Sequence, residues 1–99
     1  MNTSPAQTVK FTAVVTLRFN TNSPDKTYFA CYADVIDKGD TDMQLGDKVI
    51  LRGHSDMYIE KNLKIVVSGE FTGINTYNIP RREYKIYELW PDKDRRSLI

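Results

Sequence analysis

Residues Val9 to Phe19 read VKFTAVVTLRF, and apolar side chains stand at every odd position of this stretch. Polar residues occupy most of the even positions between them. Because successive side chains of a β-strand point to opposite faces, this period of two predicts a strand with one buried face. On this pattern Val15 and Leu17 face the core and Arg18 faces outward.

The same alternation recurs along the rest of the chain, and segments rich in Gly, Asn, Asp or Pro separate its repeats. No segment has the 3.6-residue period of an amphipathic helix. The sequence therefore predicts an all-β fold, a small five-stranded antiparallel barrel with little or no helix, because closure removes exposed strand edges. Beyond the first strand, we expect strands over residues 28–37, 48–59, 63–74 and 83–90, loops at 20–25, 38–47 and 75–82, and a hairpin tip at 60–62.

The length of 99 residues fits a single domain, with the barrel over about residues 9–90 and mobile ends at 1–7 and 91–99. Hydrophobic residues make up 40% of the chain and charged residues 27%, a mix typical of soluble globular proteins. No apolar run approaches the roughly 20 residues of a membrane-spanning helix, and the start of the chain lacks a signal-peptide pattern. We therefore expect a cytoplasmic protein, or a nuclear one in a eukaryote, with no membrane partner.

Few residues of this chain have the spacing that metal or catalytic sites need. The single cysteine, Cys31, cannot form an internal disulfide, and together with the single histidine, His54, it cannot supply a structural zinc site. No Gly-rich phosphate loop or catalytic motif is present, so the sequence predicts a protein that is not an enzyme and has no cofactor. One acidic concentration lacks the register of a calcium loop and is expected to be a solvated turn: Asp34, Asp37, Asp40, Asp42 and Asp47.

The segment Leu45-Gly-Asp-Lys-Val-Ile-Leu-Arg-Gly53 resembles the opening of the third strand in single-stranded DNA-binding proteins of the oligonucleotide/oligosaccharide-binding (OB) fold. The resemblance covers roughly Val9 to Trp90. The helix that commonly lies next to the third strand in this family has no counterpart, and the acidic tail of bacterial members is absent. These departures favour a small viral, plasmid or accessory-subunit version. In the OB fold, strands two and three and the loops joining strands one to two and four to five form the ligand face.

The candidate binding residues follow from strand alternation. If Phe29 and Cys31 fill the core together with Ala33 and Val35, then Tyr28 lies outside the barrel. Outward tyrosines expose flat rings on which bases can stack, and the third strand brings basic side chains beside them. The resemblance adds the two loops that flank this face. The predicted nucleic-acid-binding residues are Arg18, Lys26, Tyr28, Tyr32, Arg52, His54, Tyr58, Lys64, Tyr77, Arg81 and Arg82.

The leading functional hypothesis is non-catalytic binding of single-stranded nucleic acid, with DNA favoured over RNA, in replication, recombination or repair. Aromatic stacking and phosphate neutralisation would carry it, with partnership in a homo-oligomer or with a replication protein left open. The alternative is an OB-fold interaction module or accessory subunit that docks a protein through its tyrosines and through Val14, Ile50 and Val66. The net charge of +1 favours this alternative. Strand tyrosines can also serve sheet stability alone, and the Arg81-Arg82 pair can simply be solvated.

Overall fold

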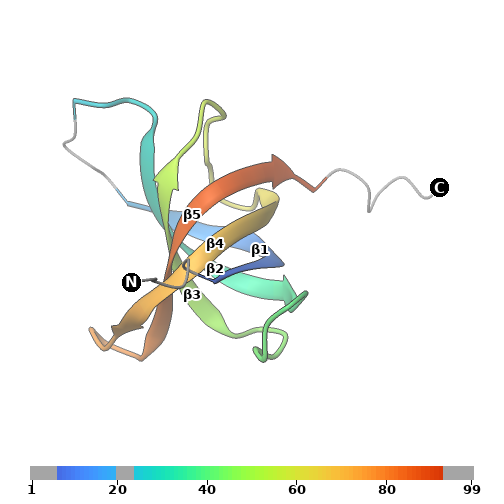
Figure 1. Ribbon diagram of the computed structural model, residues 1–99. Coiled ribbons are helices and arrows are strands. Elements are labelled where there is room, and N and C mark those ends of the chain that lie inside the picture. Colours follow the sequence, from blue (N-terminus) through green and yellow to red (C-terminus); the bar gives the residue numbers. More distant parts are fainter. Residues whose placement is uncertain (1–6, 20–23, 93–99) are drawn as a thin grey trace, which may run out of the picture.

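The computed structural model describes residues 7–19 and 24–92, and its five strands close into a barrel in the order β1-β2-β3-β5-β4 (Figure 1). No helix occurs among these residues, so none of them forms a helix that could cross a membrane. The expected all-β barrel is therefore confirmed. Most of the expected mobile ends, and part of the expected 20–25 loop, fall on residues 1–6, 20–23 and 93–99, outside the described part, whereas Pro91, expected in the mobile C-terminal end, belongs to the last strand. The strands are β1 (Thr8–Arg18), β2 (Tyr28–Asp37), β3 (Lys48–His54), β4 (Lys64–Asn75) and β5 (Arg81–Pro91).

The core lies inside the barrel, where alternate side chains from all five strands meet. Strand β2 follows its predicted alternation, because Phe29, Cys31, Ala33 and Val35 are each at most 2% exposed. Burial raises the pKa of the Cys31 thiol to about 12. The outward side chains of β2 are consequently fixed in direction as well.

The pairing of β3 corrects the prediction of a wholly antiparallel barrel. Strand β3 is antiparallel to β2 but parallel to β5, and the described residues show no pairing of β3 with β4. The expected hairpin at 60–62 is therefore wrong. Strand β3 ends at His54, and the connection at 55–63 instead hydrogen-bonds to Val15 of β1 and places Ile59, 2% exposed, in the core. The alternating positions of Met57 and Ile59 resembled the pattern of a strand. Both side chains pack against the core, but from an irregular segment.

A β-bulge corrects the predicted directions at the end of β1. The register of β1 against β2 shifts between Val15 and Leu17, so that Leu17 lies opposite the outward Tyr32 and Arg18 lies opposite the inward Cys31. Leu17 is accordingly 52% exposed. Because one extra residue reverses every later side chain, Arg18 turns toward the end of the barrel instead of its outer wall.

Strand β5 has a second bulge beside it and begins earlier than predicted. The register of β4 against β5 shifts between Ser68 and Gly69, and beyond this shift Leu89 packs against the core and Trp90 is exposed. The strand begins at Arg81, so the basic pair expected in a loop belongs to β5. Arg81 and Arg82 therefore point to opposite sides of the sheet.

Two glycines allow β5 to fit closely between its neighbours. Gly53 of β3 and Gly69 of β4 both lie opposite Ile86 of β5. A Cβ atom at Gly53 would lie 2.6 Å from the Ile86 carbonyl oxygen, and one at Gly69 would lie 2.5 Å from the Lys85 carbonyl oxygen. Real Cβ atoms do not approach oxygen so closely, so these positions need the absence of a side chain.

Candidate functional site

The outer surface of β2, β3 and β5, hereafter the β2–β3–β5 face, carries the candidate site. Strand β3 lies between the other two, and the registers place outward residues in rows across all three strands. One row joins Ala30, Arg52 and Lys85. The next row joins Tyr32, Ile50 and Glu83. The parallel β3–β5 pair thus brings residues from the last strand beside those predicted from the second and third.

A hollow of about 300 Å³ lies on this face and is lined in part by Tyr28, Arg52, His54 and Lys85; we call it the central hollow. The Arg52 guanidinium donates a hydrogen bond of 3.4 Å to the Tyr28 hydroxyl. The His54 ring stands edge-on to the Tyr28 ring, with centroids 5.5 Å apart. The central hollow therefore combines an aromatic ring with three nitrogen-bearing side chains, in a volume at the lower limit of typical ligand pockets.

The charge of Arg52 is partly offset on the face itself. Its Nε atom lies 3.4 Å from Oε1 of Glu83, and the Asn75 side-chain amide donates a 2.8 Å hydrogen bond to Oε2 of the same carboxylate. The hydrogen bond to Tyr28, together with the Glu83 charge, raises the pKa of Arg52. Arg52 therefore stays charged, but an approaching anion must compete with Glu83.

His54 is held by the β1–β2 loop. Its Nδ1 atom lies 3.3 Å from a carboxylate oxygen of Asp25 and 3.1 Å from the Thr27 hydroxyl. Hydrogen bonds from Thr27, with a smaller contribution from His54, lower the pKa of Asp25. The ionised Asp25 fixes the ring at the edge of the central hollow.

Arg81 and Tyr32 form a stacked pair beside the central hollow. The Arg81 guanidinium carbon lies 4.0 Å from the centroid of the Tyr32 ring, and Phe19 contacts the same ring edge-on at 4.6 Å. The Nε atom of Arg81 is buried and has no hydrogen-bond partner. A planar cation on a tyrosine presents a surface on which either a base or a phosphate can bind.

Arg18 and Tyr58 form a second stacked pair at the end of the barrel. Their separation is 5.1 Å from guanidinium carbon to ring centroid, and the Nε atom of Arg18 is likewise buried without a partner. Tyr58, expected on a strand, lies in the 55–63 connection and is 67% exposed. Lys26, from the β1–β2 loop, is exposed. Together with Arg18 and Tyr58 it lines a small hollow at this end of the barrel.

The remaining three predicted residues also lie outside the central hollow. Lys64 of β4 pairs in register with Val14 of β1, and the other partner of Val14 is Asp34 of β2, so Lys64 is separated from β2 by one strand. Arg82 takes the inward direction and forms a 2.7 Å ion pair with Asp42, which lowers the pKa of Asp42 and raises that of Arg82. Tyr77 lies in the β4–β5 turn and is 72% exposed.

Sequence reasoning missed Lys85 and Phe19 as members of the face. In the alternation of β5, Lys85 is on the other side of the sheet from Tyr84 and Ile86. Its outward direction could therefore have been predicted from the sequence. Its position next to Arg52 could not, because that follows from parallel pairing. The Phe19 contact with Tyr32 depends on the β1 bulge.

The acidic concentration is divided between strand β2, which contains Asp34 and Asp37, and the loop that follows it, so the expected single turn is wrong for these two residues. Within the described part of the chain, no group of three His, Cys, Asp or Glu side chains is placed to hold a metal ion. The carboxylates contact different partners. These are Lys48 for Asp34, the Gly39 amide for Asp37, the Lys10 amide for Asp40, Arg82 for Asp42 and the Gln44 amide for Asp47.

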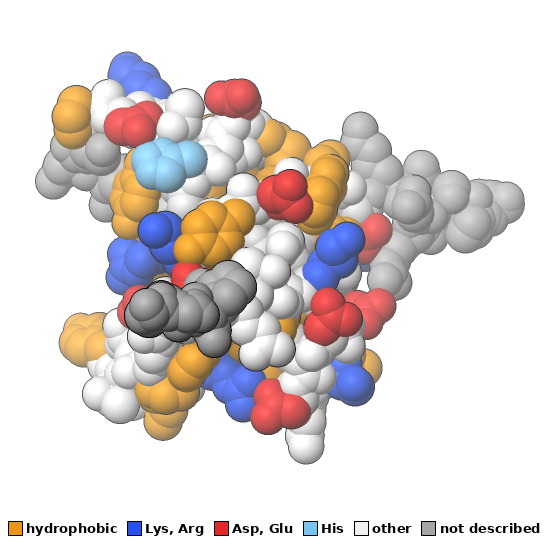
Figure 2. All heavy atoms as spheres, viewed as in Figure 1, with side chains coloured by type: hydrophobic (Ala, Val, Ile, Leu, Met, Phe, Trp, Pro, Cys, Tyr) orange, Lys and Arg blue, Asp and Glu red, His pale blue; other side chains and the backbone are white. Residues whose placement is uncertain are grey.

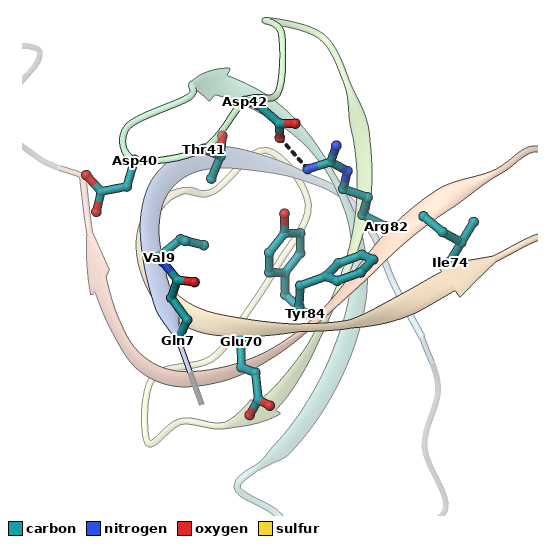
Figure 3. Close-up of a pocket in the computed structure, with 10 residues that line it drawn as sticks. Gln7, Val9, Asp40, Thr41, Asp42, Glu70, Ile74, Arg82 and Tyr84 are labelled. Atoms are coloured by element: carbon teal, nitrogen blue, oxygen red, sulfur yellow. Dashed lines mark hydrogen bonds and ion pairs between the residues drawn. The ribbon is translucent and has the colours of Figure 1, made fainter. Parts of the chain in front are cut away.

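A larger hollow of about 600 Å³ lies where β1 begins, and Arg82 and Tyr84 of β5 are among its lining residues (Figure 3). Asp40, Asp42 and Glu70 line it against one cation, Arg82, so we call it the acidic hollow. Its lining includes Phe71, which is 48% exposed. The excess of carboxylates disfavours phosphate here.

No protein-family model, curated protein or solved structure matches this chain. The small five-stranded barrel is consistent with an OB-like fold. Figure 2 shows basic and acidic side chains interspersed across the face in view, in keeping with the net charge of +1. The candidate site is therefore defined by the geometry of the β2–β3–β5 face and not by a basic patch.

Proposed function

We propose that this protein binds single-stranded nucleic acid on the β2–β3–β5 face, without catalysis, in the manner of single-stranded DNA-binding proteins. The observation that carries the proposal is the central hollow, where Tyr28 meets Arg52, His54 and Lys85. A base held against an aromatic ring contributes about 1–3 kcal/mol with little dependence on sequence. The surrounding cations supply the contacts to phosphate that such binding also needs.

The stacked pair of Arg81 and Tyr32 extends this site along β2. Tyr32 is four positions after Tyr28, which corresponds to roughly 13 Å along a β-strand. Neighbouring nucleotides of one strand can therefore contact both rings. The resemblance in Leu45–Gly53 favours DNA over RNA, and a role in replication, recombination or repair follows from that preference.

The alternative function, docking of a partner protein, is supported by a different observation. The end of β4 and the turn that joins it to β5, residues 71–80, are here called the β4–β5 arm. Three apolar side chains of this arm are exposed: Phe71 at 48%, Ile74 at 54% and Ile79 at 41%. Of the outer residues first expected to dock a partner, however, Ile50 is only 2% exposed, so the β2–β3–β5 face offers little free aliphatic surface. A protein partner would use the arm and leave the face free.

Fluorescence anisotropy with a labelled thymidine strand of about 20–30 nucleotides, titrated at several salt concentrations, tests the proposal. Tyr28→Ala should weaken binding by about 1–3 kcal/mol and leave the salt dependence unchanged. Arg52→Gln should weaken binding and reduce the slope of log affinity against log salt by about 0.7. Lys64→Gln, away from the central hollow, is the matched control for loss of one charge. Absence of binding at low salt would favour the alternative.

A further inference from the structure

Arg18, like Arg81, has a buried Nε atom without a hydrogen-bond partner, and a small hollow lies beside it. The hollow measures about 140 Å³ and lies between the end of β1, the β1–β2 loop and the 55–63 connection. We call it the Arg18 hollow, and its lining includes Arg18, Lys26, Tyr28, Ser55 and Tyr58. Its volume suits a group the size of a phosphate and is too small for a nucleotide.

Arg18 reaches this hollow because of the β1 bulge. On a regular strand its guanidinium would lie on the outer wall, in solvent. The bulge turns it toward the barrel end, where it lies over the Tyr58 ring at 5.1 Å and its Nε atom is buried without a hydrogen bond. Among the described residues no carboxylate forms an ion pair with Arg18. A half-buried cation that has no carboxylate partner is stabilised by an anionic ligand.

The Arg18 hollow lies next to the proposed nucleic-acid site, because Tyr28 lines both it and the central hollow. A strand whose base stacks at Tyr28 therefore has an adjacent phosphate within reach of this end of the barrel. Asp56 also lines the Arg18 hollow and opposes the charges of Arg18 and Lys26, so the lining keeps one net positive charge.

We propose that the Arg18 hollow binds one phosphate group of the nucleic-acid strand, with Arg18 as the main contact and Lys26 as the second cation. This inference rests on the proposed function. It adds that the bound nucleic-acid strand extends from the central hollow to the Arg18 hollow. Arginine suits the role because its planar fork can donate two hydrogen bonds to one phosphate. The stack on Tyr58 holds that fork in place before the ligand arrives.

Inorganic phosphate alone is the first probe, titrated into labelled protein and followed by amide chemical shifts in NMR at constant ionic strength. Shifts should centre on residues 18, 26 and 55–58. Arg18→Gln should weaken phosphate binding by about tenfold or more, as expected for a charge-assisted hydrogen bond. Arg18→Lys keeps the charge without the fork and should bind with intermediate affinity, while Lys64→Gln should bind as the wild type. A wild-type response in Arg18→Gln, or no saturable shift, would overturn the proposal.

The thymidine strand is the second probe and separates the two proposals. Arg18→Gln should weaken strand binding and lower the salt slope by about 0.7, whereas Lys85→Gln, which changes the lining of the central hollow only, should leave binding of inorganic phosphate intact. Normal strand affinity and slope in Arg18→Gln would remove the Arg18 hollow from the path and leave the proposed function standing. Phosphate binding without any strand binding would overturn the proposed function and, with it, the assignment of this hollow to a nucleic-acid strand.

Discussion

Glu83 opposes binding at the centre of the proposed site. Its carboxylate lies 3.4 Å from Arg52 and accepts a 2.8 Å hydrogen bond from Asn75. It therefore neutralises one of the cations that would meet phosphate, while it also holds Arg52 in position. If the face binds a nucleic-acid strand, removal of the Glu83 charge should therefore strengthen binding.

Glu83→Gln should raise the affinity for a thymidine strand by about two- to fivefold, the range expected for loss of one partly exposed charge interaction. The amide keeps the shape of the side chain and one acceptor oxygen for Asn75. Anisotropy titration measures the change, and Glu88→Gln, exposed elsewhere on β5, is the charge-matched control. Unchanged or reduced affinity would show that strand phosphates do not approach Arg52.

Cys31 reports on the direction of the side chains of β2. Burial raises its pKa from 9.0 to about 12, so the folded thiol keeps its proton where the unfolded thiol loses it. The contribution of the protonated Cys31 thiol to the stability of the folded protein is complete below pH 9. It is lost as the pH rises toward 12. Over this range the wild type should lose up to about 1.4 kcal/mol of unfolding free energy per pH unit relative to Cys31→Ala.

Urea unfolding at several alkaline pH values measures this difference. A thiol reagent should also react with the native protein only as fast as it unfolds, because the thiolate is the reactive form and it is inaccessible. Rapid modification of folded protein would mean that Cys31 faces outward. Tyr28 and Tyr32, on the other side of β2, would then face the core.

At the scale of the strands, alternation predicted side-chain direction wherever the ladder is regular. Strand β2 is regular at Phe29, Cys31 and Ala33, and the predicted core residues there are confirmed. The bulge before Leu17 reversed the later directions in β1, and so the predicted directions of Leu17 and Arg18 were wrong. A bulge depends on how two strands fit each other, which is not encoded in the period of either strand alone.

Close packing of β5 between β3 and β4 leads to a stability prediction. Gly69→Ala should destabilise the protein by about 1–3 kcal/mol, because the new Cβ atom would meet the Lys85 carbonyl oxygen at 2.5 Å. Thermal or urea unfolding measures the loss. Ser68→Ala, the preceding residue on the outer side of β4, is a suitable control and should change stability much less. Equal effects would show that β4 and β5 are not so close.

At the scale of the whole molecule, the sequence indicated a closed barrel but not its strand order. Five alternating segments and the absence of helical periodicity were enough for the fold class. The parallel contact of β3 with β5 joins Arg52 to Lys85 across 33 residues of chain, and no local pattern reports it. The central hollow is therefore a product of topology, and sequence reasoning found only the part that β2 and β3 contribute.

An NMR chemical-shift map with an unlabelled thymidine strand tests the central claim most directly, because it locates binding without any substitution. The proposed function predicts that the largest amide shifts lie around Tyr28, Arg52 and Lys85. Outer residues of β1 and β4, such as Lys10 and Ser68, should remain unchanged. Absence of saturable shifts, or shifts concentrated around Phe71 and the acidic hollow, would contradict it.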